Sequence, residues 1–163
     1  SNLKTNNKMQ NTFMTEAIRL SSEGLQKGEG GPFGAVVVKD GKIIARGNNC
    51  VTSTNDPTAH AEVVAIRRAC AELGTFQLNG CEIYTSCEPC PMCLGAIYWA
   101  RPDKVYYANT RIDAANIDFD DYFIYQEINQ SPELREIPFI HLPHPDALKV
   151  FANWVNKKDK TTY

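Results

Sequence analysis

Hydrophobic positions along the chain recur at two different spacings, which predict alternating helices and short strands. Phe13, Ala17 and Leu20 fall on one side of a helix with about 3.6 residues per turn. Residues 81–86 are instead a short run rich in strand-forming residues, as is typical of a buried strand. On this basis we expect helices over 12–26, 59–73, 91–99, 122–128 and 146–155, and strands over 33–39, 42–47, 81–86 and 104–108.

The order of these elements predicts the fold class. Asp40-Gly41 separates the first two strands and is a two-residue sequence that favours an antiparallel hairpin. The strand, helix, strand order over 81–108 is typical of a parallel pair, whose two faces must both be covered. We therefore expect an α/β fold, a three-layer α/β/α sandwich with a central mixed sheet of about five strands.

The length of 163 residues is typical of one folded domain. Residues 1–10 are polar and lack an apolar repeat, so we expect a flexible N-terminal tail there. We expect a single domain over residues 11–163.

The composition argues against several classes of protein. Hydrophobic residues make up 43% of the chain, which is enough for a core, so intrinsic disorder is not expected. The 17 Lys and Arg are outnumbered by 19 Asp and Glu, whereas nucleic-acid-binding proteins usually carry a basic surplus. The longest apolar stretch, 92–100, is far shorter than the roughly 20 residues that span a bilayer. We therefore expect no membrane span and no nucleic-acid partner.

The six cysteines indicate a metal site and a reducing compartment. A chain of this length does not need disulfides, and no apolar signal segment precedes the first predicted helix. We therefore expect a cytoplasmic protein with free thiols. Cys87, Cys90 and Cys93 follow one another at a spacing of three, which is common among metal ligands and rare in disulfide frameworks.

Cys90 and Cys93 open the predicted helix 91–99, where both sulfur atoms lie on one side of the first turn. The positive end of the helix dipole stabilises thiolates, the form of cysteine that binds metal. Two thiolates and an imidazole suit Zn²⁺, and His60 is the natural third ligand, which leaves a fourth position for water. We thus expect one catalytic Zn²⁺ per chain, held by these three residues.

Glu62 is the candidate for proton transfer at this site. It follows His60 by two residues at a predicted helix start, where both side chains can face a point beyond the helix end. A carboxylate close to zinc but not bound to it can take a proton from water and pass it to a leaving group. We expect Glu62 to act first as general base and then as general acid.

Other interpretations of these residues stay open at this point. The three closely spaced cysteines match the start of an iron–sulfur motif, although Ile97 stands where the nearby fourth cysteine would fall. Cys87 can instead supply a fourth zinc ligand and close a structural site, which would make the protein an inert interaction domain. His60 and Glu62, taken alone, match a sequence that occurs often by chance at helix starts.

His60-Ala61-Glu62 and Pro89-Cys90-Pro91-Met92-Cys93 together resemble the signature of the zinc-dependent nucleobase deaminases, H-x-E and P-C-x-x-C. The resemblance extends to residues 30–36, 55–58 and 86–89. It implies the cytidine deaminase fold and the zinc ligands and Glu62 role given above.

The later part of the chain is similar to bacterial guanine deaminases, at Phe119-Asp120-Asp121, Phe123-Ile124-Tyr125 and Asn156-Lys157-Lys158. This resemblance implies that zinc activates a water that attacks C2 of guanine, releasing ammonia and xanthine.

The same resemblance implies a purine pocket. Phe33 matches the residue that stacks on the purine, Asn49 one that hydrogen-bonds it, and Asp121 a second acid that binds the base and helps proton transfer. An acidic acceptor opposite the N–H donors of guanine, with an aromatic face, suits selection of this base. Trp99, on the predicted helix of the cysteines, is a further pocket candidate, with a dimer interface or the core as alternatives.

The resemblance also implies a homodimer in which residues 145–163 cross to the partner subunit, and Tyr163 matches a terminal tyrosine that contributes to the partner's site.

Substrates other than guanine can undergo the same zinc-dependent deamination. The alternatives are an adenosine flipped from a tRNA loop, for which a basic surface is expected, and small amino-heterocycles such as guanosine, isocytosine or a triazine amine.

Overall fold

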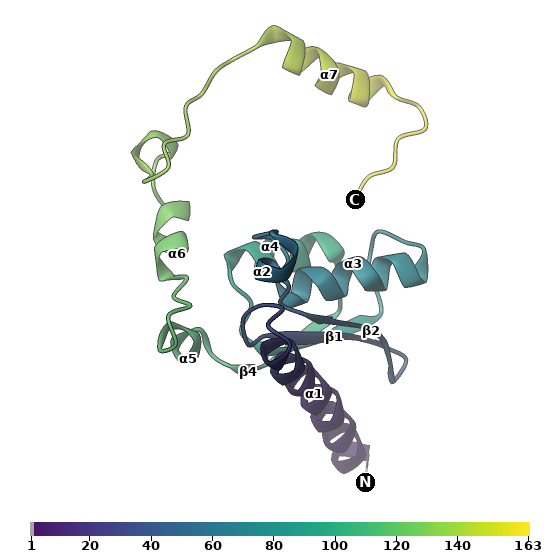
Figure 1. Cartoon of the computed structure of the whole chain (residues 1–163). Coiled ribbons are helices and arrows are strands. Elements are labelled where there is room, and N and C mark those ends of the chain that lie inside the picture. Colours follow the sequence, from purple (N-terminus) through teal and green to yellow (C-terminus); the bar gives the residue numbers. More distant parts are fainter. Residues whose placement is uncertain (1) are drawn as a thin grey trace. The chain divides into compact units, whose positions relative to one another are not determined.

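A four-stranded mixed sheet in the order β2-β1-β3-β4 forms the centre of the first part of the chain (Figure 1). β1 (Gly34–Lys39) pairs antiparallel with β2 (Lys42–Asn48) and β3 (Cys81–Cys87), and β3 pairs parallel with β4 (Lys104–Asn109). The computed structural model describes residues 2–163. The expected mixed sheet is confirmed with four strands rather than about five, because the chain after β4 continues as short helices.

The turn between β1 and β2 is the predicted two-residue hairpin. Asp40 and Gly41 both have positive φ angles, 50° and 73°, as a turn that matches the twist of paired strands requires.

Helices cover both faces of the sheet, so the three-layer α/β/α class is confirmed (Figure 1). α1 (Asn2–Gln26) packs on one face, and α3 (Ala61–Leu73) and α4 (Pro91–Ala100) pack on the other. Side chains alternate along β1: Val36 joins the cluster under α1, whereas Val37 joins the cluster under α3 and α4. Both valines are fully buried.

Two glycines allow the helices to approach the sheet closely. A Cβ atom on Gly34 would collide with the backbone of α1, and one on Gly47 would collide with the backbone of α3. Because Gly47 lies near the end of β2, this contact places the first turn of α3 directly against the sheet.

The N-terminal helix is longer than the sequence predicted. α1 begins at Asn2, so residues 2–10 are helical where a tail was expected, and Ser1 lies outside the described residues. The side chains of residues 2–9 are exposed, which explains why no apolar repeat marks this part of the helix.

Residues 122–163 form a separate compact unit, divided from the first between Asp121 and Tyr122. It contains α6 (Tyr122–Ile128), a 3₁₀ turn η1 (Pro132–Leu134) and α7 (Pro145–Asn156), so both predicted helices are present. The single domain over residues 11–163 stays a prediction.

Two further short helices, α2 (Val51–Thr54) and α5 (Arg111–Ala115), were not predicted. Both are shorter than two turns and contain no buried residue, so no apolar repeat in the sequence predicts them. Within the described residues, no helix combines the length and the apolar character that crossing a membrane would require.

Candidate functional site

His60 stands at the N-terminus of α3, held there by the loop that precedes the helix. Asp56 accepts hydrogen bonds from the backbone N–H and the hydroxyl of Thr58, at 2.8 and 2.7 Å, and so forms a tight turn. The N–H of His60 then donates to the carbonyl of Thr58 at 2.8 Å. His60 itself has extended backbone angles, so its side chain leaves the chain just before the helix begins.

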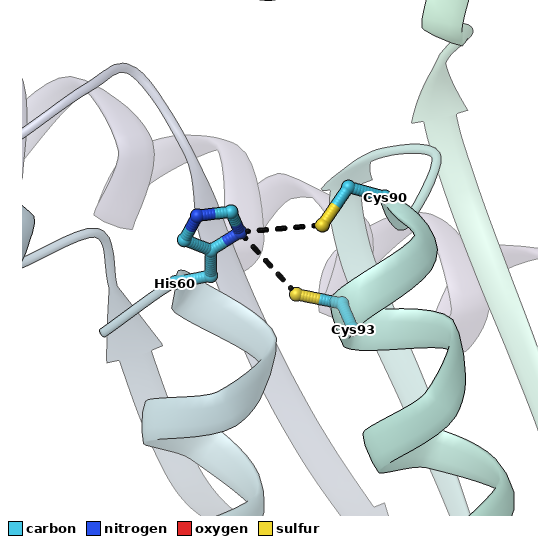
Figure 2. A group of neighbouring side chains, drawn as sticks. All are labelled: His60, Cys90 and Cys93. Atoms are coloured by element: carbon cyan, nitrogen blue, oxygen red, sulfur yellow. Dashed lines mark hydrogen bonds between the residues drawn. The ribbon is translucent and has the colours of Figure 1, made fainter. Parts of the chain in front are cut away.

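Cys90 and Cys93 are placed by α4 as the sequence predicted. Cys90 is the extended residue before the helix, Pro91 occupies the first helical position, and Cys93 follows within the first turn. The two sulfur atoms thus project from the N-terminal end of α4 toward His60 (Figure 2).

These three side chains meet at one point. His60 Nδ1 lies 3.5 Å from Cys90 Sγ and 3.4 Å from Cys93 Sγ, and the three ligand atoms lie within 4.8 Å of one another (Figure 2). Tetrahedral zinc, with bonds of about 2.3 Å to sulfur and about 2.0 Å to nitrogen, would separate these ligand atoms by about 3.6 Å. The donor set and its spacing therefore fit zinc, with three protein ligands rather than four.

The electrostatics of the cluster favour a metal-binding thiolate. A hydrogen bond from the Cys93 thiol, aided by His60, lowers the pKa of Cys90 to about 4 against the opposing effect of burial. The corresponding contact with Cys90 raises the pKa of Cys93 and also that of His60. Cys90 is thus already ionised at neutral pH, in the form that coordinates a cation.

Glu62 is buried beside this cluster. Only 6% of the residue is exposed, and burial raises the pKa of its carboxyl, while a hydrogen bond with the Cys93 thiol opposes that shift. Glu62 is not among the three grouped ligands, which agrees with the expectation of a carboxylate close to the metal but not bound to it.

Cys87 does not join the ligands. It ends β3, and its thiol donates to the carbonyl oxygen of Thr110 at 3.7 Å. Burial raises the pKa of Cys87 to about 11, so the thiol is neutral. This arrangement argues against the closed four-ligand site and against an iron–sulfur cluster, both of which require Cys87 as a ligand.

Phe33 and Asn49 lie side by side at the ends of β1 and β2. The N–H of Asn49 donates to the carbonyl of Phe33 at 3.0 Å. The side-chain oxygen of Asn49 accepts from the N–H groups of Gly31 and Val51, at 3.3 and 3.1 Å. These two backbone donors fix the orientation of the buried amide.

Asp121 lies within electrostatic range of the metal ligands. Burial raises the pKa of its carboxyl, and the negative charge of Cys90 raises it further, while Arg111 acts in the opposite direction. The structure therefore brings Asp121, from a loop after β4, into the field of a centre that otherwise comes from α3 and α4.

Trp99 is not brought to this centre. It follows Cys93 by six residues, which is about 9 Å along a helix axis. Trp99 is 61% exposed, and the guanidinium of Arg101 lies 5.8 Å from the centre of its ring.

The model of the cytidine and deoxycytidylate deaminase zinc-binding region matches residues 7–109, well over half of the chain. The chain belongs to this deaminase family. The matched range contains the three grouped ligands and Glu62, so the family assignment and the geometry of the site agree.

Within the deaminase family, the chain is similar to the guanine deaminase of Bacillus subtilis strain 168. The two are 58% identical over 152 residues, which cover 93% of this chain and 97% of the relative. A solved structure of guanine deaminase from Bacillus subtilis has a TM-score of 0.92 to this chain at 57% identity, over 94% of this chain and 98% of that one.

Similarity to other deaminases of the family covers less of the chain. The tRNA-specific adenosine deaminase of Aquifex aeolicus is 45% identical over 96 residues, which cover 59% of this chain and 63% of the relative. A solved guanine deaminase from Nitrosomonas europaea has a TM-score of 0.64 at 34% identity, over 67% of this chain and 63% of that one.

The structure adds one aromatic residue to those that the sequence singled out for the site of this deaminase. The ring of Phe119 meets that of Phe33 edge to face, with centroids 5.0 Å apart and an interplanar angle of 90°. Phe119 drew attention only as part of a motif, although a large aromatic residue two positions before Asp121 is a signal that could have indicated a role.

Proposed function

We infer that this protein is a zinc-dependent guanine deaminase, which hydrolyses guanine to xanthine and ammonia. The observation that carries this inference is the open cluster of His60, Cys90 and Cys93 with Glu62 buried beside it. It occurs in a chain whose similarity to a guanine deaminase runs through the second unit, beyond the part shared with the tRNA deaminases.

His60, Cys90 and Cys93 would hold the Zn²⁺. When bound, the ion acts as a Lewis acid that lowers the pKa of water to about 7 and so supplies a nucleophile at neutral pH.

Glu62 moves the proton. Its buried carboxyl accepts a proton from the attacking water and passes it to N3 while the bond from oxygen to C2 of guanine forms and the C2=N3 π bond breaks. It then takes the proton of the new C2 hydroxyl and donates it to the amino nitrogen as the C2–N bond breaks, so C2 becomes the carbonyl carbon of xanthine and ammonia leaves. The upward shift of the pKa of Glu62 by burial suits this role, because it makes the carboxylate a stronger base toward the attacking water.

The purine would lie between polar and aromatic groups of the first unit. We assign Phe33 to stacking on the ring, and the fixed NH₂ group of Asn49 to donation to a ring nitrogen or oxygen. Asp121 would accept hydrogen bonds from the N–H groups of the base and take part in proton transfer. We assign Trp99 to the protein surface, with a dimer interface as its role, because it lies far from the metal ligands along α4.

We also propose a homodimer in which residues 145–163 pass to the partner subunit and bring Tyr163 to its site. In support of this, no residue within 122–163 is buried, although α7 carries Leu148, Phe151 and Val155 along one side. An amphipathic helix with an uncovered apolar stripe gains stability only when another surface covers it.

The proposed dimer can be tested with Phe151→Asp, because Phe151 is 73% exposed and a charge at this position would be costly to bury in an interface. Sedimentation is expected to show a dimer for the unmodified protein. For the variant, we expect the dissociation constant of the dimer to be higher by at least about a hundredfold. A monomer in both proteins would exclude the passage of residues 145–163 to a partner subunit.

We further infer a cytoplasmic location, where all six thiols stay reduced.

The activity is tested by ammonia release from guanine, guanosine, cytosine, isocytosine and a tRNA stem-loop that contains adenosine, with zinc measured on the same sample. We expect release from guanine with about one zinc per chain. Turnover of the stem-loop alone would leave the roles of His60, Glu62, Cys90 and Cys93 intact but would overturn the purine pocket proposed around Asp121.

A further inference from the structure

The segment Ser86-Cys87-Glu88 has no part in the chemistry described above, although it stands directly before the metal loop. It connects the end of β3 to Pro89 and Cys90. The hydroxyl of Ser86 accepts the N–H of Gly34 at 3.0 Å, so this segment holds the chain next to Phe33. Glu88, at the other end of the segment, contacts the start of α5.

Glu88 ties the metal loop to the start of α5. Its N–H donates to the carbonyl of Asn109 at 2.8 Å, which continues the parallel pairing of β3 with β4. Its carboxylate accepts the N–H of Arg111, the first residue of α5, at 3.1 Å. A hydrogen bond to a charged acceptor is stronger than one between neutral groups.

α5 in turn determines where Phe119 and Asp121 lie. Thr110 and Asp113 close the N-terminus of α5 by a reciprocal capping box. At its other end, the N–H of Phe119 donates to the carbonyl of Ala114 at 3.0 Å. The ring of Phe119 then meets Phe33, and Asp121 follows two residues later.

We propose that Glu88 is a positioning residue for the substrate pocket. Through Arg111 and α5, its carboxylate fixes the position of Phe119 and Asp121 relative to Cys90, two residues after it in the chain. Glu88 takes no part in bond making and does not bind metal. This proposal rests on the proposed deaminase function, because the positions of Phe119 and Asp121 matter only if a base binds beside them.

The first test compares Glu88→Ala with Glu88→Gln. The alanine variant loses the acceptor, and we expect the KM for guanine to rise about tenfold, while kcat changes less than about threefold. Zinc content is expected to stay at about one per chain. Glu88→Gln keeps an oxygen acceptor at the same place and is expected to restore KM to within about threefold of the unmodified protein.

A second pair of variants removes the same hydrogen bond from its other side. Arg111→Pro deletes the donor N–H at the first helical position, where proline is well tolerated, and the extended angles of Thr110 suit a following proline. Arg111→Ala keeps the N–H but loses the guanidinium, so it is the matched control. We expect KM to be higher in Arg111→Pro than in Arg111→Ala by the same factor of about ten, and no further rise when Glu88→Ala is added to Arg111→Pro.

Amide hydrogen exchange supplies a readout that does not depend on turnover. The N–H of Arg111 is expected to exchange faster in Glu88→Ala than in the unmodified protein or in Glu88→Gln. Glu72→Ala, an exposed change on α3, controls for the loss of a carboxylate and is expected to leave KM, zinc and exchange unchanged.

The proposal would be overturned by an unchanged KM in Glu88→Ala, by a KM rise that merely follows zinc loss, or by equal damage in the glutamine variant. If the unmodified, zinc-loaded protein does not release ammonia from guanine, the proposed function fails. The exchange of the Arg111 amide still reports the hydrogen bond in that case.

Discussion

The two units of this chain differ in where their apolar side chains go. In residues 2–121, the sheet buries Val36 and Val37 on its opposite faces, and helices of the same unit cover both. In residues 122–163 no residue is buried, and Phe151 is 73% exposed although it lies on an amphipathic helix. The first unit thus completes its own core, whereas the second carries an apolar stripe that its own residues do not cover.

The two units should therefore differ in whether their contribution to the site depends on another chain. The metal centre lies between elements that are held by their own core, since α3 and α4 both pack on the sheet. Its formation should not depend on another chain. If a second subunit covers this stripe, as proposed above, the contribution of the second unit to a site should depend on assembly.

The largest effect is expected from His60→Ala, which removes one of the three grouped ligands. Zinc is expected to fall from about one per chain to near zero, and activity should fall by more than the roughly 10²- to 10⁴-fold that a single acid–base group contributes. The proposed homodimer should persist, because α7 is unchanged. Full activity in a zinc-free variant would refute the ligand assignment.

Glu62→Gln should separate chemistry from metal binding within the first unit. The amide has nearly the same size but cannot carry the proton, so kcat is expected to fall about 10²- to 10⁴-fold. Zinc should stay at about one per chain, because the carboxylate is not one of the ligands. Atomic absorption and ammonia release on one sample measure both quantities. Loss of turnover with zinc retained excludes the inert zinc domain, whereas normal turnover would refute the role of Glu62 in proton transfer.

Val37→Ala tests the claim that the first unit is stabilised by its own core. Val37 is fully buried in the sheet, so the loss of two methyl groups and the resulting cavity should lower the free energy of unfolding by about 2 kcal/mol. Urea unfolding followed at two protein concentrations should show the same loss at both. A loss that vanishes at high concentration would mean that this core, too, depends on assembly.

Much of the first unit could be predicted because its signals are local. Cys90 and Cys93 share one helical turn, and His60 opens another helix, so short spacings already indicated the metal ligands. The strand ends came within one or two residues because each strand is a short run of apolar and strand-forming residues, and β1 and β3 are buried along almost their whole length.

The parts that the sequence did not reveal lack such local patterns. The first turns of α1 are exposed, and α5 is too short for an apolar repeat. The approach of Phe119 to Phe33 depends on α5 and on the turn after it, and no spacing of residues encodes that path. Trp99 is exposed because it lies away from the face of α4 that buries Cys93, Ile97 and Ala100, and the uniform hydrophobicity of that helix does not reveal which face is buried.

The smallest effect, and the most direct test of the contrast between the units, is expected from Tyr163→Ala. We expect the KM for guanine to rise about tenfold, as for the loss of one good contact, with zinc and the dimer unchanged. If Tyr163 acts across subunits, co-expression of Tyr163→Ala with Glu62→Gln should create mixed dimers. One of their two sites then combines an intact Glu62 with an intact tyrosine from the partner subunit, and it should turn over guanine with normal KM. If Tyr163 serves its own chain, every site in the mixture carries one defect, and no fraction with normal KM can arise.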